Sequence, residues 1–125
     1  MESILLSIKP EYVQRIFAGI KQYEYRKRLP KKKFERIIVY ATYPVMQVIG
    51  EVKLVGLTSG NPTTIWEATK EHSGISRAKY REYFKECNVA HALHLGEATK
   101  YATPKSLNDF GISNPPQSFI YINDF

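Results

Sequence analysis

The chain has 125 residues, of which 43% are hydrophobic and 24% are charged, and this is typical of one globular domain with its own core. We therefore expect a single domain over residues 1–125. No apolar run approaches the roughly 20 residues of a membrane span, and no basic lead precedes the first apolar run, so neither a membrane partner nor a secretory signal is expected. Cys87 is the only cysteine, which excludes a disulfide framework and predicts a cytoplasmic setting.

The net charge of +6 is concentrated in the first third of the chain. Residues 1–36 contain ten Lys or Arg and four acidic residues, whereas residues 37–125 contain eight of each. A concentrated basic region favours a polyanionic partner, above all nucleic acid. The alternative is a solvated basic surface that serves only solubility.

The first elements are predicted in the order strand, helix, strand. Residues 3–8 form a β-type run, and Pro10 suits the first turn of a helix. The helix has an apolar stripe at i, i+3, i+4 and i+7, and Gly19 is placed to end it. Residues 22–28 are predicted as a strand, and the alternation of side chains in a strand places Glu24, Arg26 and Arg28 on one face.

The rest of the chain is mostly β. Residues 36–43 and 45–60 are predicted strands, with bulges or bends at Gly50 and Gly56. Asn61 and Ser76 are expected to cap two helices that run to about His72 and over residues 77–87. The last two strands are expected at residues 89–102 and 118–122. This order predicts the α+β class, as a small, partly closed mixed barrel of about six strands with flanking helices.

A metal site is not expected, because the three histidines show no ligand spacing with Cys87. Cys87 itself is interpreted as a small apolar residue in the core. The sequence also lacks a glycine-rich phosphate loop, and we expect no cofactor.

The segment from Lys21 to Arg28 is the strongest candidate for a functional site. A carboxylate among cations stays ionised and can hold a guanidinium in one orientation. A lysine crowded by arginines has a lowered pKa and could act as a base or a nucleophile, although Glu24 favours its charged form. The alternative is an ordinary exposed strand with ion pairs.

The stretch "SIKPEYVQRIFAGIKQYEYRKR" resembles the opening of the ASCH domain, a branch of the PUA-like superfold. Gly19, Lys21, Glu24 and Arg26 match the G-x-K-x-x-E-x-R element of that family position by position. Further segments resemble an ASCH subgroup described as PUA-like regulators, namely "YATYP", "GEV", "SGIS" and "PPQSF". The resemblance implies a small β-barrel with flanking helices and a cleft that carries the G-x-K-x-x-E-x-R residues.

The resemblance also implies binding of nucleic acid, with RNA favoured, or of a nucleotide-like ligand. One ASCH-type branch consists of amidohydrolases that deacetylate acetylcytidine by means of a Lys, a Thr three residues later and a distant Glu. Lys21 matches that Lys, but Glu24 stands at the Thr position, and an ungapped alignment places Ser73 near the remote Glu. If the chain is such an enzyme, Lys21 and Glu24 are the catalytic candidates. A protein-interaction module is a third alternative, and the oligomeric state is left open.

The predicted ligand-binding residues extend beyond the motif. Arg28 and three lysines of the following turn are expected to attract phosphate, and polar residues at other strand ends are expected to join the cleft. Trp66 could stack on a base but is interpreted as part of the core. The full set is Lys9, Lys21, Glu24, Arg26, Arg28, Lys31, Lys32, Lys33, Tyr40, Thr42, Gln117 and Ser118.

Overall fold

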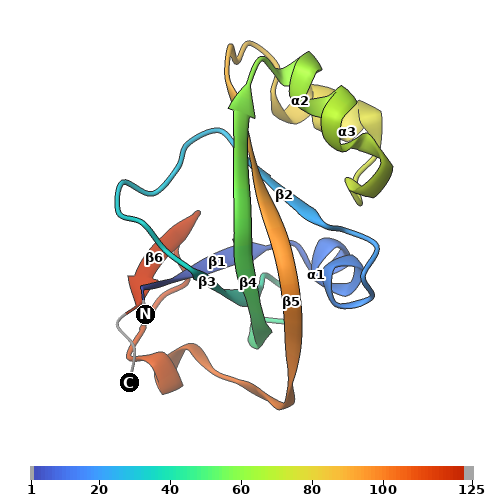
Figure 1. Ribbon diagram of the computed structural model, residues 1–125. Coiled ribbons are helices and arrows are strands. Elements are labelled where there is room, and N and C mark those ends of the chain that lie inside the picture. The colour runs from blue at the N-terminus through green and yellow to red at the C-terminus, as the bar shows by residue number, and fades with distance from the viewer. Residues whose placement is uncertain (1, 123–125) are drawn as a thin grey trace.

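The computed structural model describes residues 2–122, which form a six-stranded sheet with three α-helices (Figure 1). The strands are β1 (Ser3–Ile8), β2 (Tyr23–Arg26), β3 (Arg36–Ala41), β4 (Gln47–Gly60), β5 (Ala90–Lys105) and β6 (Phe119–Ile122). The helices are α1 (Pro10–Phe17), α2 (Pro62–Thr69) and α3 (Arg77–Tyr83), and two 3-10 turns cover Lys70–His72 and Leu107–Phe110. The predicted α+β class with about six strands is therefore confirmed.

The sheet is mixed, with the strand order β2-β5-β4-β3-β1-β6. Strands β1 and β3 are parallel, and the other pairs are antiparallel. Strands β2 and β6 are the two edges of the sheet, so the curled sheet stays open as a half-barrel. This agrees with the partly closed barrel expected from the sequence. The long pair β4–β5 spans the molecule in Figure 1, with α2 and α3 at one end.

The pairing of β4 with its neighbours is interrupted at the glycines that the sequence pointed to. Its register with β5 shifts between Val48 and Gly50 and again between Leu54 and Gly56. At Gly50 a Cβ atom would lie 2.4 Å from the carbonyl oxygen of Thr99, so the two backbones approach closely only because this residue has no side chain.

Strand β1 is buried on both of its faces. Ile4, Leu6 and Ile8 belong to a core cluster that also contains Val13 and Ile16 of α1. Leu5 points to the opposite face and joins a second cluster with Ile38, Tyr40 and Val48. The alternation of side chains along β1 therefore ties the helix α1 on one face to the second cluster on the other.

A third cluster lies beneath α2 and α3. It includes Tyr25 of β2, Ile65 of α2, and Tyr80 and Phe84 from α3 and its C-terminal end. Trp66 and Cys87 pack partly buried against this cluster, as expected for core residues. The Thr69 hydroxyl donates to the Ile65 carbonyl at 2.7 Å, so the Tyr25 hydroxyl donates to Thr69 Oγ1, also at 2.7 Å, and joins β2 to α2.

Several predicted elements are shorter in the structure, and two of them are shortened most. The strand expected at residues 22–28 is limited to Tyr23–Arg26, because Arg26 pairs with His91 and the partner strand begins at Ala90. Arg28 therefore lies beyond the strand, not on the face of Glu24 and Arg26. The helix expected at residues 77–87 ends at Tyr83, whereas the predicted caps Asn61 and Ser76 accept hydrogen bonds from the backbone as expected. No helix among the described residues is long and apolar enough to cross a membrane.

The turn before α3 packs directly on Lys21. Gly74 has a positive φ of 64°, and a Cβ atom there would lie 2.3 Å from Cβ of Lys21. Two carbonyl groups of the same turn accept hydrogen bonds from side chains. Nζ of Lys21 donates to the Ser73 carbonyl at 2.8 Å, and Arg15 donates to the Gly74 carbonyl at 2.9 Å. A residue with a side chain at position 74 therefore meets both backbone strain and a steric clash.

We expect Gly74→Ala to lower the free energy of unfolding more than Gly111→Ala does. Gly111 also has a positive φ, of 72°, but a Cβ atom there meets nothing within 4 Å, so its substitution carries only the conformational cost of roughly 1–2 kcal/mol. Gly74→Ala adds an overpacking cost of about 1–3 kcal/mol. Urea unfolding of both variants measures the difference, and equal losses would show that the contact with Lys21 is not tight.

Candidate functional site

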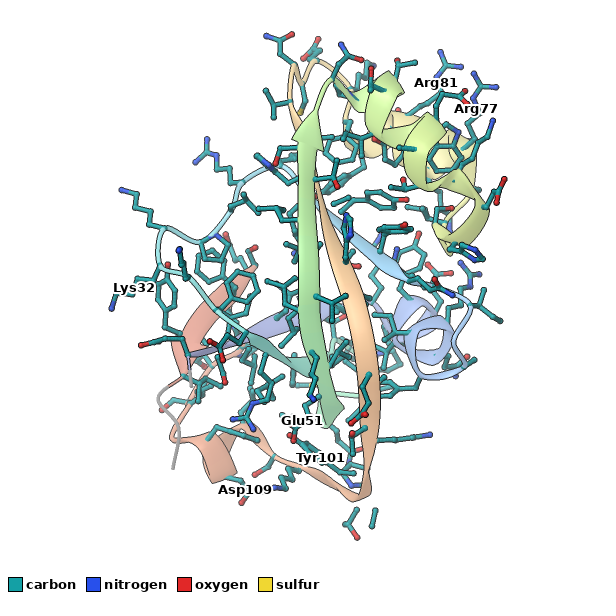
Figure 2. All side chains as sticks on the ribbon, viewed as in Figure 1. Lys32, Glu51, Arg77, Arg81, Tyr101 and Asp109 are labelled. Atoms are coloured by element: carbon teal, nitrogen blue, oxygen red, sulfur yellow. The ribbon has the colours of Figure 1, made fainter. Side chains whose placement is uncertain are left out.

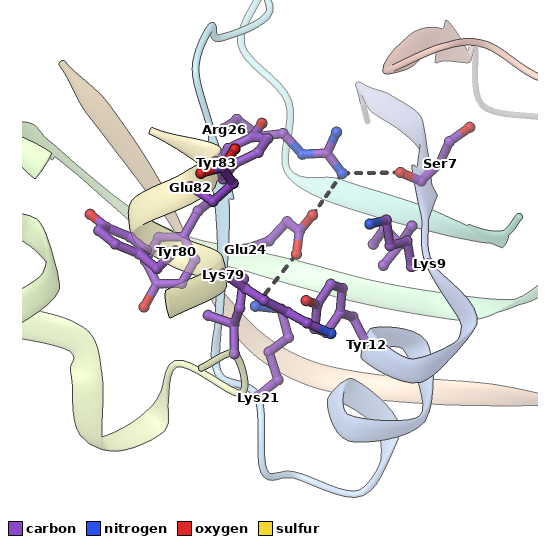
Figure 3. A pocket seen from close by; sticks show the side chains of 13 residues that line it. Ser7, Lys9, Tyr12, Lys21, Glu24, Arg26, Lys79, Tyr80, Glu82 and Tyr83 are labelled. Carbon is purple, nitrogen blue, oxygen red and sulfur yellow. Dashed lines mark hydrogen bonds and ion pairs between the residues drawn. The ribbon is translucent and has the colours of Figure 1, made fainter. Parts of the chain in front are cut away.

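A cleft of about 430 Å³ lies between α1 and α3 and has β2 at its floor (Figure 3). This volume is within the range of roughly 300–1,000 Å³ that is usual for small-ligand pockets. Strand β1 and the residue after it contribute Ser7, Ile8 and Lys9. The remaining lining residues are Tyr12, Lys21, Glu24, Tyr25, Arg26, Ile75, Lys79, Tyr80, Glu82 and Tyr83.

Three charged side chains form a continuous chain at the floor of the cleft. Glu24 Oε2 accepts a hydrogen bond from an Arg26 terminal nitrogen at 2.6 Å, and its Oε1 lies 3.7 Å from Nζ of Lys21. Lys21 and Glu24 are only 3% and 7% exposed, so the pairing takes place largely out of water. Two cations share one carboxylate, which leaves the floor with an excess of positive charge.

The Lys21 ammonium group is enclosed by a carbonyl group and two aromatic rings. Nζ donates to the Ser73 carbonyl oxygen at 2.8 Å. It also lies 5.3 Å from the ring centroid of Tyr12 and 5.0 Å from that of Tyr25, within the range of cation–π attraction. These contacts hold the side chain in one orientation at the bottom of the cleft.

Burial lowers the pKa of Lys21 below its usual value, because the charged form is poorly solvated there. Glu24 opposes this shift, whereas Arg26 and Arg15 add to it. The sequence indicated the opposite effects of Glu24 and of the arginines in the motif, but the contribution of Arg15 and the burial, which is the largest cause, become visible only in the folded chain. Lys21 therefore gives up its proton more readily than an exposed lysine does.

Arg26 joins β2 to the other edge of the sheet. A terminal nitrogen donates to the Ser7 carbonyl oxygen at 3.1 Å, and the other makes a weaker contact of 3.4 Å with the Ser118 hydroxyl. The buried Nε has no hydrogen-bond partner among the described residues. An unmet buried donor costs about 1–3 kcal/mol, so the position of this guanidinium is not explained by stability alone.

The rim of the cleft is more exposed and carries further cations. Lys9 and Lys79 are exposed, and Lys79 Nζ lies 3.5 Å from Glu11 and 6.0 Å from the Tyr12 ring centroid. Tyr83 forms part of the α3 wall, and burial of its hydroxyl raises its pKa, so the phenol stays neutral. The site thus combines a charged floor with aromatic walls and an exposed cationic rim of lysine side chains.

The structure brings together four of the predicted ligand-binding residues and separates most of the others. Lys9, Lys21, Glu24 and Arg26 line the cleft, and Ser118 reaches it through Arg26. Tyr40 does not join the cleft, because it is 2% exposed within the second core cluster. The remaining predicted residues lie outside the lining, namely Arg28, Lys31, Lys32, Lys33, Thr42 and Gln117.

The basic turn of residues 31–33 is distant from the cleft in the view of Figure 2, where Lys32 projects from the side opposite to α1 and α3. The Lys32 ammonium group packs over the ring of Tyr121, 5.2 Å from its centroid. A role of this turn in phosphate contact stays a prediction, but it does not form the rim of the cleft.

Several lining residues were not identified from the sequence. Tyr12 follows the start of α1, whereas Lys79, Tyr80 and Tyr83 come from α3, more than fifty residues after the motif. Lys79 and Tyr83 are four residues apart and so share a helix face, which is a signal present in the sequence. Nothing in that pattern shows that the face covers β2, because the contact depends on the third core cluster.

Within residues 2–122, no group of three or more His, Cys, Asp or Glu side chains is arranged to hold a metal ion. His91 and His94 instead contact the hydroxyls of Ser59 and Thr58, at 2.6 and 2.7 Å. The cleft itself presents two cations and one carboxylate at a poorly solvated floor, where burial lowers the pKa of Lys21.

Comparison with known sequences identifies relatives that match most of this chain. A 92-residue stretch, 73% of this chain, is 35% identical to an ASCH domain-containing ribonuclease of Zymomonas mobilis and spans 62% of it. A stretch of 122 residues is 33% identical to the large ribosomal subunit protein uL22 of Ureaplasma parvum, of which it spans 39%, and 34% identical to the ATP synthase subunit alpha of that organism, of which it spans 15%. The chain thus matches only part of the length of these curated relatives.

Solved structures agree with the sequence comparison. The crystal structure of ASCH from Zymomonas mobilis superimposes with a TM-score of 0.88 at 30% identity, covering 97% of this chain and 87% of that one. The N-terminal domain of McrB from Staphylothermus marinus has a TM-score of 0.53 at 16% identity over 86% of this chain and 77% of that one, and shares the fold alone. The family model of the ASCH domain matches residues 6–99, which hold the whole charged floor of the cleft. The chain belongs to the ASCH domain family.

Proposed function

We propose that this domain binds single-stranded RNA and receives one nucleotide in the cleft between α1 and α3. The observation that carries the proposal is the Lys21–Glu24–Arg26 chain, whose positive charge exceeds its negative charge at a poorly solvated floor. A phosphate group would supply the missing negative charge, and an arginine binds phosphate with directed hydrogen bonds.

The aromatic walls support a nucleotide rather than a simple anion. Tyr12, Tyr80 and Tyr83 line the same cleft as the cations. Aromatic side chains stack on unpaired bases with about 1–3 kcal/mol per base, and a base can enter such a cleft only when it is free of a duplex. The combination therefore favours a single strand over a double helix.

The choice of RNA over DNA is supported by the relatives. The Zymomonas mobilis protein with 35% identity is described as an ASCH domain-containing ribonuclease, and the ASCH family model covers the part of this chain that holds Lys21, Glu24 and Arg26. We extend only its class of ligand to this chain as part of the proposal.

We expect Lys79→Ala to weaken the binding of a fluorescein-labelled oligouridylate by about two- to five-fold, as for the loss of an exposed ionic contact of roughly 0.5–1 kcal/mol. The slope of log K against log salt should flatten by about 0.7, which corresponds to one phosphate contact on a single strand. Fluorescence anisotropy at several salt concentrations measures both quantities.

Lys100→Ala is the matched control, because Lys100 is an exposed lysine of β5 outside the cleft lining. The triple alanine variant of Lys31, Lys32 and Lys33 tests the basic turn, and it should weaken binding evenly across RNA sequences if the strand leaves the cleft in that direction. Equal effects of Lys79→Ala and Lys100→Ala would contradict binding in the cleft.

Cleavage of RNA is the second candidate function, and the lowered pKa of Lys21 favours it. A neutral lysine can take the proton of a ribose 2′-hydroxyl, after which the 2′-oxygen attacks the adjacent phosphorus and the 5′-oxygen leaves with a proton from solvent. Arg26 lines the same cleft and, in this mechanism, would stabilise the negative charge that develops on the phosphoryl oxygens.

If Lys21 is the base, the cleavage rate should rise with pH, because only the neutral amine accepts a proton. The rate should level off below the ordinary lysine pKa of 10.5, since burial lowers the pKa of this group and the neutral amine then predominates at a lower pH. Gel analysis of an end-labelled oligouridylate measures the rate, and an oligonucleotide with 2′-deoxyuridine throughout is the control that cannot react. A rate in Lys21→Met equal to that of the native chain would exclude this role.

We expect little or no hydrolysis of acetylcytidine by the native chain. The carboxylate of Glu24 stands where the amidohydrolases have a neutral hydroxyl, and it would repel the developing oxyanion, at a site where loss of one donor already costs about 100-fold or more. Chromatographic separation of cytidine from acetylcytidine tests this. Turnover near one per second that is lost in Lys21→Ala would establish the amidohydrolase alternative instead.

A further inference from the structure

A second groove, of about 300 Å³, lies between α2 and α3 on the side of α3 that faces away from the cleft. Trp66 of α2 and Phe84 contribute apolar surface, and Arg77 and Arg81 of α3 contribute charge. Tyr80 lines both the groove and the cleft, so α3 is a wall shared by the two.

The two arginines of the groove are available to a ligand. Arg77 and Arg81 are one helical turn apart, both are exposed, and Figure 2 shows them together on the outer side of α3. Within residues 2–122, neither makes an ion pair or hydrogen bond. The one carboxylate of the groove, Glu67, is held by Lys70 at 2.7 Å, which together with the charge of Arg77 lowers its pKa.

Trp66 supplies an aromatic surface of fixed orientation. Its ring lies 4.7 Å from that of Tyr80, tilted by 42°, and the residue is half-buried at the wall of the groove. Because Tyr80 is 3% exposed and donates its hydroxyl to the Pro62 carbonyl at 2.7 Å, the indole rests on a rigid support. A tryptophan beside two exposed arginines is a combination suited to a base and its phosphate.

We infer that the groove between α2 and α3 binds a second nucleotide of the same RNA strand, with its base against Trp66 and its phosphates near Arg77 and Arg81. The inference rests on the proposed function, since the strand must also occupy the cleft. A strand that crosses α3 passes from one binding surface to the other over a helix about 10–12 Å wide. An acidic protein segment would complement the arginines, but it would not use the tryptophan or the continuity with the cleft.

Trp66 is the only tryptophan of the chain, so intrinsic tryptophan fluorescence reports on this groove alone. We expect an oligouridylate of about eight nucleotides, within the usual range of site sizes, to quench the emission of Trp66. Uridine monophosphate, which cannot occupy the cleft and the groove at once, should compete with the oligonucleotide for the cleft and quench the emission less than the oligonucleotide does.

The double variant Arg77→Ala/Arg81→Ala should bind uridine monophosphate as the native chain does. Its salt slope for the oligouridylate should be lower by about 1.4, which is two phosphate contacts at about 0.7 each, and the quenching should be lost. The control is Lys53→Ala/Lys85→Ala, which removes the same charge from two exposed lysines outside the groove and the cleft.

The outcomes separate this inference from the proposed function. If the oligouridylate binds in a manner that depends on Lys79, but Trp66 emission does not change and both double variants behave alike, the second site is disproved and the cleft proposal stands. If the native chain binds no RNA, both fall. Quenching by polyglutamate in place of RNA would assign the groove to an acidic protein and would also overturn the inference.

Discussion

The buried chain of charges from Lys21 through Glu24 to Arg26 is the constraint on which the candidate site depends. Removing one partner of a buried ion pair typically costs about 3–5 kcal/mol, because the other charge is left without compensation in a poorly solvated place. The hydrogen bonds and ion pairs that these three groups make form only when β2, the carbonyl of Ser7 and the carbonyl of Ser73 come together. The electrostatics of one short strand therefore determine how the turn before α3 and the end of β1 must be arranged around it.

Helix α3 provides one wall of the cleft and one wall of the second groove, the two proposed binding surfaces. Its inner residues Tyr80 and Phe84 pack with Tyr25 of β2 in one aromatic cluster, in which the Tyr25 and Tyr80 rings meet edge to face at 5.0 Å. Because that packing holds the helix against β2, the side chains on either flank are directed to opposite sides. Lys79 and Tyr83 meet the cleft, and Arg77 and Arg81 meet the second groove. One packed helix thus supports both surfaces.

The same geometry explains why the pKa of Lys21 is lowered although the Glu24 carboxylate lies beside it. Next to Glu24 alone, a lysine would keep its proton more firmly. Its enclosure by Tyr12, Tyr25 and the backbone of the 73–74 turn removes water, and this desolvation outweighs the carboxylate. The glycine at position 74 permits the enclosure, since any side chain there would occupy the space that Lys21 fills. A lowered pKa in this family motif is thus a property of the turn as much as of the motif.

The local features of this protein could be predicted from the sequence. The strand at residues 3–8, the helix caps at Asn61 and Ser76 and the bulges near Gly50 and Gly56 follow from short-range propensities. The resemblance to the G-x-K-x-x-E-x-R element of the ASCH family identified the three residues of the cleft floor.

Which distant residues complete the site depends on the tertiary structure. Tyr40 and Tyr83 are the same type of residue but have different surroundings. Tyr40 lies in the core because β3 is covered on both faces. Tyr83 lines the cleft because its helix covers only one edge of the sheet. The basic turn holds three consecutive lysines, but it lies away from the cleft. The reason is that β2 loses its partner strand after Arg26, and the chain leaves the sheet there. Burial and strand pairing depend on contacts between residues far apart in the chain, and no local pattern encodes them.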